Sequence, residues 1–407
     1  MTGSARLVVI GASHAGVQLA ASARDLGWSD PITLIGDEAD APYQRPPLSK
    51  AYLTGNAAEE SLPLRGPAFY RERQIDLLTG TRALTVDTAA HTVTNGDGTV
   101  LPWDKLAFAT GTRARALPCV PPGTRGVLAL RTLDDARRLR DAWAARDVVI
   151  AGAGYIGLEV AAALAQEKRH VTVIEAQPRI LSRTTPAPVA QWMTDLHMRH
   201  GVSLALSTTI QSVQTDAGAI RAVACSDGRV LPADLLVVGI GVLANDDIAR
   251  AAGIDCDDGI LVDEFARTSH PDVVAAGDCT RHFSLHAGRK VRLESIQNAT
   301  DQARTAAATL VGQSQPYRAV PWFWTDQFGF KLQTAGIAGD AAQSVVRGDV
   351  QGGKFSWFHF TDNRLVAVDT INKPAEHMLA RKLLAARTAL TPAQAADPLF
   401  ELGSALS

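Results

Sequence analysis

The chain has 407 residues, of which 46% are hydrophobic and 20% are charged, and this length predicts two or three domains rather than one core. Its formal net charge of −2 argues against a nucleic-acid-binding protein, which needs a basic excess to meet phosphates. No apolar run is long enough for a membrane-spanning helix, so no membrane partner is expected either.

The first predicted unit opens the chain. An apolar run from Leu7 to Ile10 leads into the glycine turn GASHAG, an alanine-rich helical stretch follows, and a second apolar run begins at Ile32. This order predicts the start of a βαβ unit. The first run is short and is followed at once by glycine, which favours a strand over a signal peptide.

The turn GASHAG has Gly11 and Gly16 where a dinucleotide-binding turn needs them, but Ser13 replaces the middle glycine. A serine adds a Cβ near a pyrophosphate, yet its hydroxyl can also donate to a phosphate. Taken alone, the motif fits a structural turn equally well. Asp37 or Glu38 is the candidate for a ribose contact, because Asp37 follows Gly11 by 26 residues, near the roughly 20 expected.

A Pro/Arg-rich segment, residues 114–126, is predicted to cross between domains, and the opening pattern then repeats from Val148. Here GAGYIG is a complete GxGxxG between a strand and a helix. Its first glycine makes a tight turn, the second lets the backbone approach a pyrophosphate, and the third lets helix and strand pack closely. The helix N-terminus supplies N–H groups and partial positive charge. The predicted NADH-binding residues of this turn are Gly152, Gly154, Tyr155, Ile156 and Gly157.

Glu175 ends the second strand of the repeat, 23 residues after Gly152. A carboxylate at this place accepts hydrogen bonds from both ribose hydroxyls of NADH and would repel the 2′-phosphate of NADPH. Arg179 could soften that preference, although a solvated loop arginine is the simpler interpretation. Two dinucleotide sites in one chain suggest one bound flavin and one exchanging nicotinamide cofactor.

Later strands are predicted from Leu235 and from Asp272, and the second of these ends in AAGD. The glycine permits close backbone approach, and Asp278 could accept a hydrogen bond from a flavin ribityl hydroxyl; alone, the segment fits a strand-end turn better. From Ala319, short strands rich in aromatic residues and a helix near residues 374–386 predict a separate small domain. The tail after Thr391 shows no pattern and is expected to be partly disordered.

With these motifs in place, the chain resembles the FAD-dependent ferredoxin reductases of bacterial oxygenase systems along nearly its whole length. The segments RPPLSK (45–50), ESIQNA (294–299) and PWFWTDQ (321–327) are specific to this group, whereas GxGxxG is not. The chain departs from the group at Ser13 and at Thr325, where relatives often carry serine.

The resemblance implies roles for residues that the bottom-up argument leaves unassigned. Lys50 would lie near the flavin ring and Glu159 beside the nicotinamide, so these two are the predicted catalytic residues; without the resemblance, Lys50 is a surface lysine. Together with the first glycine turn, the predicted FAD contacts are Gly11, Ser13, Ala15, Gly16, Asp37, Lys50, Ala83, Arg131, Asp278, Ile296 and Trp324.

The implied fold is α/β, with two Rossmann-like dinucleotide-binding domains arranged as in disulfide-reductase-like flavoproteins and a small C-terminal α+β domain. The FAD domain would comprise residues 1–112 and 240–318, the NADH domain residues 113–239 and the C-terminal domain residues 319–407. NADH would give hydride to FAD, and electrons would pass singly to a small acidic [2Fe–2S] ferredoxin that feeds an oxygenase. The protein is expected to be a monomer or a weak homodimer.

The cysteines limit the route of the electrons. Relatives that reduce disulfides carry redox cysteines near the flavin edge, but the corresponding stretch, residues 41–50, has none. The four cysteines are scattered, with no CxxC pair and no metal-ligand spacing, which predicts no metal site and a cytoplasmic protein with reduced thiols: Cys119, Cys225, Cys256 and Cys279. Electrons would therefore leave the flavin directly.

Three points stay open at this level. A basic cluster is suggested to face the ferredoxin, although a solvated turn is as good an interpretation: Arg289, Lys290, Arg292 and Arg304. An NADH oxidase or quinone-type reductase would use the same fold without a ferredoxin. An NADH-sensing redox signalling flavoprotein would use it to change its assembly state.

Overall fold

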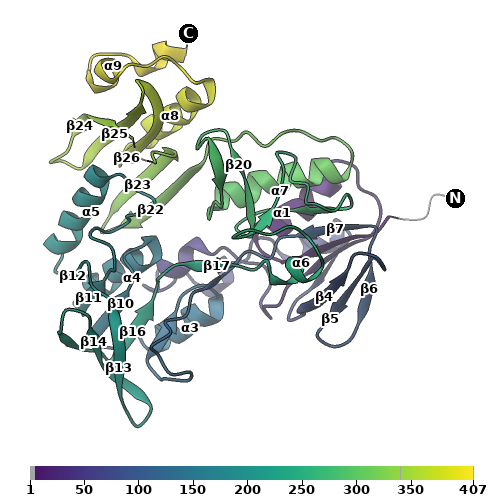
Figure 1. Ribbon diagram of the computed structural model, residues 1–407, viewed down its shortest axis with the longest axis horizontal. Helices are drawn as coiled ribbons and strands as arrows, with labels where there is room; N and C mark the ends of the chain where they lie inside the picture. The colour runs from purple at the N-terminus through teal and green to yellow at the C-terminus, as the bar shows by residue number, and fades with distance from the viewer. Residues whose placement is uncertain (1–4, 340, 407) are drawn as a thin grey trace. The chain divides into compact units, whose positions relative to one another are not determined.

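The computed structural model describes residues 5–339 and 341–406 (Figure 1). The chain forms two compact units, each described here by itself. Unit 1 comprises Met1–Gln44, Glu60–Arg113 and Leu243–Pro321; unit 2 comprises Arg45–Glu59, Ala114–Val242 and Trp322–Ser407. The predicted NADH and C-terminal domains thus fall in one unit, and the finer domain boundaries stay a prediction.

Unit 1 is built on a five-stranded parallel sheet. Its strand order is β19 (Val273–Ala275), β7 (Lys105–Phe108), β1 (Leu7–Ile10), β2 (Ile32–Ile35) and β3 (Ile75–Leu78). These strands are almost wholly apolar because both faces of a parallel sheet are covered. Helices α1 (His14–Asp25) and α7 (Ile296–Leu310) contact each other, as Figure 1 shows, through alanines that include Ala20 and Ala306.

Smaller elements complete unit 1. Helix α2 (Pro67–Glu72) precedes β3, and α6 (Asp247–Ala251) contacts β4. Unit 1 has two further three-stranded sheets: β4 (Ala83–Asp87), β5 (Thr92–Asn95) and β6 (Val100–Pro102), and β18 (Ile260–Leu261), β20 (Thr280–Ser284) and β21 (Arg289–Val291). The two-stranded ribbon of β8 (Thr112–Ala114) and β17 (Val242–Ala244) carries the chain out of unit 1 and back.

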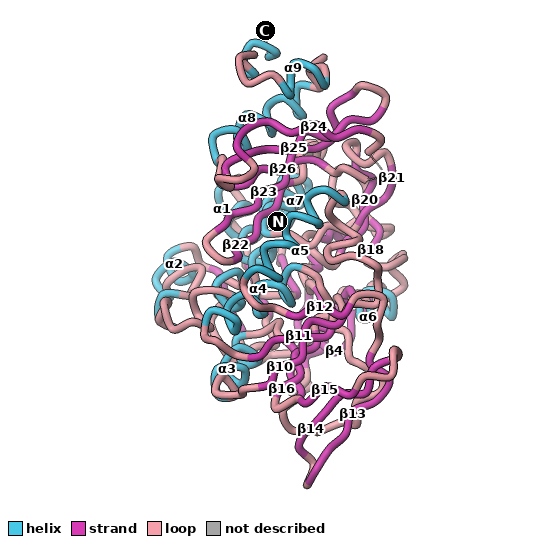
Figure 2. Tube along the Cα trace, turned by 90° about the vertical axis from the view of Figure 1, so that its left-hand side faces the viewer, coloured by secondary structure: helices cyan, strands magenta, loops and turns pink. Residues whose placement is uncertain are grey.

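Unit 2 repeats the arrangement. Its parallel sheet has the order β12 (Ser203–Ala205), β11 (His170–Ile174), β10 (Asp147–Ala151), β16 (Leu235–Val238) and β9 (Val127–Ala129), and Figure 2 shows β10, β11 and β12 side by side. Its helices are α3 (Leu133–Asp141), α4 (Tyr155–Gln166) and α5 (Ala187–Arg199). A three-stranded antiparallel sheet lies between β12 and β16 in the chain: β13 (Ile210–Asp216), β14 (Ala219–Cys225) and β15 (Val230–Pro232).

In both parallel sheets the strand before the glycine turn, β1 or β10, lies in the middle and the next two strands continue on one side of it, which is the Rossmann topology; β9, the earliest strand of the second sheet, lies at its edge. The prediction of two Rossmann-like dinucleotide folds is therefore confirmed. Unit 2 also contains the short 3₁₀ segment η1 (Pro46–Ser49), and η2 (Glu59–Ser61) lies where the chain passes from unit 2 to unit 1. No helix in the described part of the chain is both long enough and apolar enough to cross a membrane.

The end of the chain forms an antiparallel sheet within unit 2. Its order is β22 (Trp322–Gln327), β23 (Phe330–Gly336), β26 (Arg364–Ile371), β25 (Lys354–Thr361) and β24 (Gln343–Asp349), and α8 (Pro374–Ala386) packs on β23 and β26 (Figure 1). The expected disorder after Thr391 is wrong, because α9 (Pro392–Ala396) and η3 (Leu402–Leu406) follow. The signal was present in the sequence: Thr391 and Gln394 form a capping box at the start of α9.

Candidate functional site

The second glycine turn is shaped for a pyrophosphate. Gly152 has a φ of +99°, and a Cβ there would lie 2.4 Å from the carbonyl oxygen of Gly239. A Cβ on Gly157 would lie 2.3 Å from the carbonyl oxygen of Gly152, so helix and strand can approach only without side chains. A Cβ on Gly154, by contrast, would meet nothing within 4 Å. The backbone is thus closely packed on one side of the turn and open on the side where a phosphate would bind.

Helix α4 starts from this turn. Gly154 is its N-cap, and having no side chain it leaves the first N–H groups of the helix to other acceptors. The next residue, Tyr155, hydrogen-bonds through its hydroxyl to Thr185 Oγ1 at 2.9 Å, and its ring lies 4.0 Å from that of Phe323. Burial raises the pKa of Tyr155 to about 12, so this phenol keeps its proton near neutral pH. Ile156 is exposed.

Glu175 is held beside the same turn. Its carboxylate accepts the N–H of Ala153 at 2.8 Å and the N–H of Gln177 at 2.9 Å. Arg179 donates to the carbonyl oxygens of Thr185 (2.6 Å) and Ser182 (3.0 Å). The guanidinium of Arg179 is therefore engaged with its own loop, which supports the interpretation of this arginine as a structural residue.

Glu159 lies one turn into α4 and is only 5% exposed. Its Oε1 lies 2.7 Å from Lys50 Nζ and accepts the hydroxyl of Thr325 at 2.6 Å, while its Oε2 accepts the hydroxyl of Ser49. The two predicted catalytic residues are thus brought together as an ion pair. Desolvating a carboxylate is costly unless it is paired and hydrogen-bonded, and all three partners meet that need.

Sequence reasoning missed Ser49 as a partner and noted Thr325 only as a departure from the group. The sequence did offer a signal for Ser49, because this residue directly precedes Lys50 in the segment RPPLSK. That segment forms η1, with two prolines at its start, and Lys50 follows as the C-cap. Thr325 reaches Glu159 from a strand 166 residues away, and no local pattern reports such a contact.

The first glycine turn, in unit 1, is built on the same principle. A Cβ on Gly11, whose φ is +115°, would lie 2.1 Å from the carbonyl oxygen of Ala109, and a Cβ on Gly16 would lie 1.9 Å from that of Gly11. Ser13 is the N-cap of α1, in extended conformation, so its replacement of glycine needs no unusual backbone. This turn therefore shares the closely packed side of the second turn, and its contact with a pyrophosphate stays a prediction.

The segment AAGD, residues 275–278, lies close to the first glycine turn. Gly277 has a φ of +88°, and a Cβ there would lie 3.0 Å from Cβ of Ala15. Its N–H donates to Gln302 Oε1 at 2.8 Å. Asp278 follows directly, so unit 1 brings the strand-end acid close to the turn of residues 11–16. Ile296, the first residue of α7, follows the N-cap Ser295, whose hydroxyl accepts the N–H of Asn298.

The remaining predicted FAD contacts are spread over both units. In unit 1, Ala83 begins β4 and Asp37 is exposed beyond β2, while Glu38 accepts a hydrogen bond from Tyr43. Lys50, Arg131 and Trp324 belong to unit 2. The carbonyl oxygen of Arg131 accepts from Arg45 at 2.7 Å, and the ring of Trp324 stacks on that of Trp322 with centroids 5.6 Å apart. Whether these residues contact one flavin stays a prediction.

The thiols do not form a redox pair. All four cysteines are free. Burial raises the pKa of each thiol, to about 11 for Cys256, which disfavours the reactive thiolate. Among the described residues, no group of His, Cys, Asp and Glu could hold a metal ion.

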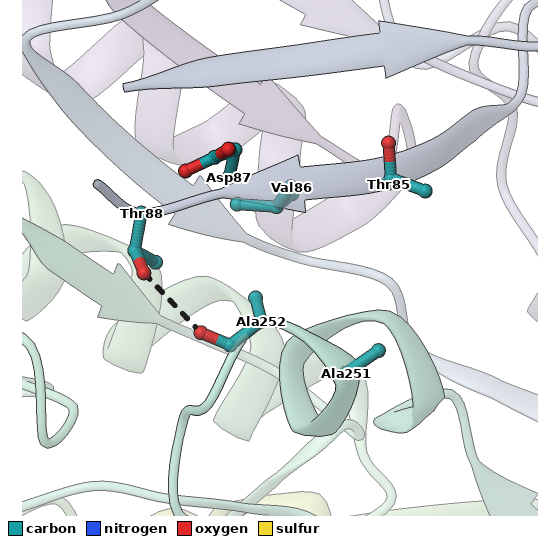
Figure 3. Close-up of a pocket in the computed structure, with 6 residues that line it drawn as sticks. All are labelled: Thr85, Val86, Asp87, Thr88, Ala251 and Ala252. Carbon is teal, nitrogen blue, oxygen red and sulfur yellow. Dashed lines mark hydrogen bonds between the residues drawn. The ribbon is translucent and has the colours of Figure 1, made fainter. Parts of the chain in front are cut away.

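A surface hollow of about 370 Å³ lies between β4 and α6 in unit 1, and Figure 3 shows the side chains that line it. Its one charged residue, Asp87, already accepts the N–H groups of Ala89 and Ala90. The Thr88 hydroxyl donates to the carbonyl oxygen of Ala252 at 3.4 Å (Figure 3). None of the predicted site residues lines this hollow, so it is not the candidate site.

Comparison with known proteins agrees with this geometry. The family described as pyridine nucleotide-disulphide oxidoreductase matches residues 5–303, and the one described as reductase C-terminal matches residues 322–406. Rhodocoxin reductase of Rhodococcus erythropolis is 44% identical over 402 residues, which cover 98% of this chain and 94% of that protein. The anthranilate 1,2-dioxygenase system ferredoxin–NAD(+) reductase component of Burkholderia cepacia is 41% identical over 399 residues, with coverage of 97% and 98%. The crystal structure of the covalent putidaredoxin reductase–putidaredoxin complex matches with a TM-score of 0.96 at 37% identity and covers 100% of this chain and 98% of that one.

Proposed function

The chain belongs to the pyridine nucleotide-disulphide oxidoreductase family, and from this premise we propose that it is an FAD-dependent reductase that passes electrons from NADH to a ferredoxin of an oxygenase system. The observation that carries the proposal is the pairing, in one chain, of two dinucleotide turns with a C-terminal domain of the reductase type. Full-length likeness to reductases that serve small redox proteins supports the choice of acceptor.

Unit 1 is the part of the chain that fits FAD. Its glycine turn has no room for side chains at Gly11 and Gly16, as in the second turn, and Asp278, beside Gly277, is the proposed acceptor for a hydroxyl of the cofactor. When bound, FAD supplies the chemistry of accepting a hydride and releasing electrons singly. Lys50, Arg131 and Trp324 of unit 2 are proposed as further contacts.

Unit 2 is the part that fits NADH. The turn of residues 152–157 would take the pyrophosphate, and Glu175 would accept the ribose hydroxyls with oxygens that the N–H groups of Ala153 and Gln177 hold in place. Glu159 would lie by the nicotinamide, with Lys50 as its counter-ion. Lys50 Nζ lies 2.7 Å from Glu159, and a lysine in this position would stabilise negative charge on a group bound beside it.

The acceptor is proposed to be a small acidic [2Fe–2S] ferredoxin. The raised pKa values of the four thiols argue against a dithiol route, so electrons pass directly from the flavin to the partner. The protein would work in the cytoplasm as a monomer or a weak homodimer. Its complex with the ferredoxin would be transient and would need only a small interface.

The test is NADH-driven reduction of cytochrome c by the purified, FAD-loaded protein, with and without [2Fe–2S] ferredoxins. The proposal expects the rate to rise with ferredoxin concentration and to saturate. Rapid oxygen or quinone reduction that no ferredoxin increases would point to an oxidase or quinone-type reductase instead. Slow turnover together with NADH-dependent dimerisation on a sizing column would point to a signalling flavoprotein.

A further inference from the structure

The carboxylate of Glu159 is the end of a buried row of hydrogen bonds within unit 2. Thr325 Oγ1 donates to Glu159 Oε1 at 2.6 Å, Gln327 Nε2 donates to Thr325 Oγ1 at 2.9 Å, and Gln327 Oε1 lies 2.6 Å from His197 Nε2. These four side chains are between 0% and 5% exposed. The row joins three elements, because Glu159 is on α4, His197 is on α5, and Thr325 and Gln327 project from the same face of β22.

The hydrogen bonds of this row can run in one direction only. The hydroxyl of Thr325 has one proton and gives it to the carboxylate, so it must accept from the amide N–H₂ of Gln327. The amide oxygen of Gln327 then needs a donor, which is His197 Nε2–H. Each donor in the row therefore points toward Glu159.

The state of His197 agrees with that direction. Burial lowers the pKa of His197 to about 4, so the ring is neutral near pH 7 and carries a proton on one nitrogen. With that proton on Nε2, Nδ1 is left as an acceptor, and this atom has no hydrogen-bond partner in the described part of the chain. A buried hydrogen-bond acceptor without a donor, such as this Nδ1, costs free energy of folding. An apolar side chain in place of His197 would pack here without that cost.

We propose that Thr325, Gln327 and His197 are positioning residues that hold Glu159 as an oriented carboxylate for NADH. This inference rests on the proposed function, because it needs Glu159 to lie beside the nicotinamide. Lys50 and Thr325 share Oε1 while Ser49 donates to Oε2, so the two hydroxyls together fix the rotation of a carboxylate that the flexible lysine alone would leave free. The other ionisable groups near this pair are Tyr155, Asp369 and, through His197, His200.

The decisive variant is Thr325→Val, which keeps the shape of the side chain and removes its hydroxyl. Thr325→Ser keeps the hydroxyl and should restore the wild-type behaviour. Thr334→Val is the matched control, because Thr334 also donates to a buried carboxylate, that of Asp369, from the same face of the next strand. All variants are to be measured as FAD-loaded full-length protein.

Two readouts separate positioning from packing. The first is kcat and KM for NADH with ferricyanide as acceptor, from pH 5.5 to pH 9, which does not depend on a ferredoxin. Thr325→Val should lower kcat/KM about tenfold over the whole pH range, the effect of one hydrogen bond to a charged group. Thr325→Ser and Thr334→Val should keep the wild-type profile.

The second readout needs no turnover. Calorimetric titration with NAD⁺ should show weaker binding for Thr325→Val, and ¹⁵N spectra of histidine-labelled protein should show that the His197 ring, one of three buried rings that stay neutral from pH 5.5 to pH 9, carries its proton on Nε2. His197→Phe should remove that signal. If Thr325→Val only lowers the melting temperature and leaves kcat/KM, the pH profile and the NAD⁺ affinity at wild-type values, the row is structural and the proposal is wrong.

The inference and the proposed function fail in different ways. A wild-type protein that oxidises NADH with ferricyanide but never responds to a ferredoxin would remove the proposed acceptor and leave the positioning test intact. A wild-type protein that neither binds NAD⁺ nor oxidises NADH would overturn both. A ¹⁵N signal that places the His197 proton on Nδ1 would overturn the direction of the hydrogen bonds in the row. It would also remove the proposed role of His197.

Discussion

Gly36 of unit 1 occupies the position that Glu175 occupies in unit 2. Each is the first residue after the second strand, and the pairing is equivalent, since Gly11 N–H donates to the Ile35 carbonyl and Gly152 N–H donates to the Ile174 carbonyl. A Cβ on Gly36 would lie 2.7 Å from Cβ of Ala12, so a glutamate could not take the same place there. The acids of the two repeats are therefore not in register: Asp37 lies one residue farther on.

The position of Glu175 leads to a prediction about cofactor choice. A carboxylate facing the 2′-phosphate of NADPH should cost a few kcal/mol, about 100-fold in selectivity for NADH. Glu175→Ala should narrow that gap, and Glu167→Ala, at the exposed C-terminal end of α4, should not. The measurement is kcat/KM for NADH and for NADPH. Equal values in the wild-type protein would contradict the assignment of Glu175.

The ion pair of Lys50 and Glu159 should be visible in stability. Lys50→Met leaves a nearly buried carboxylate with hydroxyl partners only, and because Lys50 itself is 21% exposed we expect a loss of about 1–3 kcal/mol in the free energy of unfolding. Adding Glu159→Gln should recover part of that loss. Arg138→Met, which breaks an exposed pair with Asp134, should cost less than about 1 kcal/mol. Denaturant unfolding of the wild type, both single variants, the double variant and Arg138→Met tests this, and strictly additive losses at Lys50 and Glu159 would show that the pair is not coupled.

Three buried histidines predict an acid limit to stability. Burial lowers the pKa of His197, His282 and His377 to about 4, from an ordinary value of 6.5. The unfolded chain therefore binds protons more readily between these values. The stability that these groups contribute is complete above pH 6.5 and is lost as the pH falls toward 4.

The melting temperature should thus fall between pH 6.5 and pH 4. His282→Phe should flatten this dependence, because His282 packs edge-on against Tyr317 at 5.2 Å and a phenyl ring can fill the same place. His170→Phe is the control, since His170 is exposed. A pH dependence in His282→Phe as steep as that of the wild-type protein would rule out His282 as a contributor.

FAD retention should depend on the strand-end acid of unit 1. Asp278 follows Gly277, which packs so closely on Ala15 that the acid is brought beside the first glycine turn. Asp278→Ala should weaken FAD binding about tenfold, the effect of losing one charged hydrogen-bond acceptor. Asp76→Ala, exposed on β3, should retain FAD. Flavin absorbance after dialysis measures this; a colourless wild-type protein that cannot be reconstituted would remove the premise.

The sequence could predict the local parts of this molecule but not the long-range ones. Glycine turns, their strands and helix α8 follow from neighbouring residues, so GAGYIG and the helix at 374–386 are found where expected. Strand β24 was not predicted, because its only hydrophobic pair, Val345 and Val346, gives no alternation. The contacts of Glu159 with Thr325 and of Gln327 with His197 join residues 166 and 130 positions apart, which no local pattern reports.

The basic cluster suggested for ferredoxin docking is reduced by the structure to two residues. Arg292 is 9% exposed and pairs with Asp258 and Glu294, and Arg304 pairs with Asp301 at 2.6 Å. Arg289 and Lys290 are exposed on β21, and Lys290 pairs across the ladder with Phe283, whose side chain is also exposed. A cation beside an apolar ring is a reasonable contact for an acidic protein.

Reversing both charges should therefore slow electron transfer to a ferredoxin without changing the reaction with NADH. Exposed charges act mainly on association, so Arg289→Glu/Lys290→Glu should raise KM for the ferredoxin and weaken its salt dependence. The control Arg71→Glu/Lys354→Glu changes the same number of charges at other exposed sites, on α2 and β25. Cytochrome c reduction across a salt series compares the two variants. If both behave alike while ferredoxin still accelerates the wild-type protein, the electron-transfer function stands and the docking surface lies elsewhere.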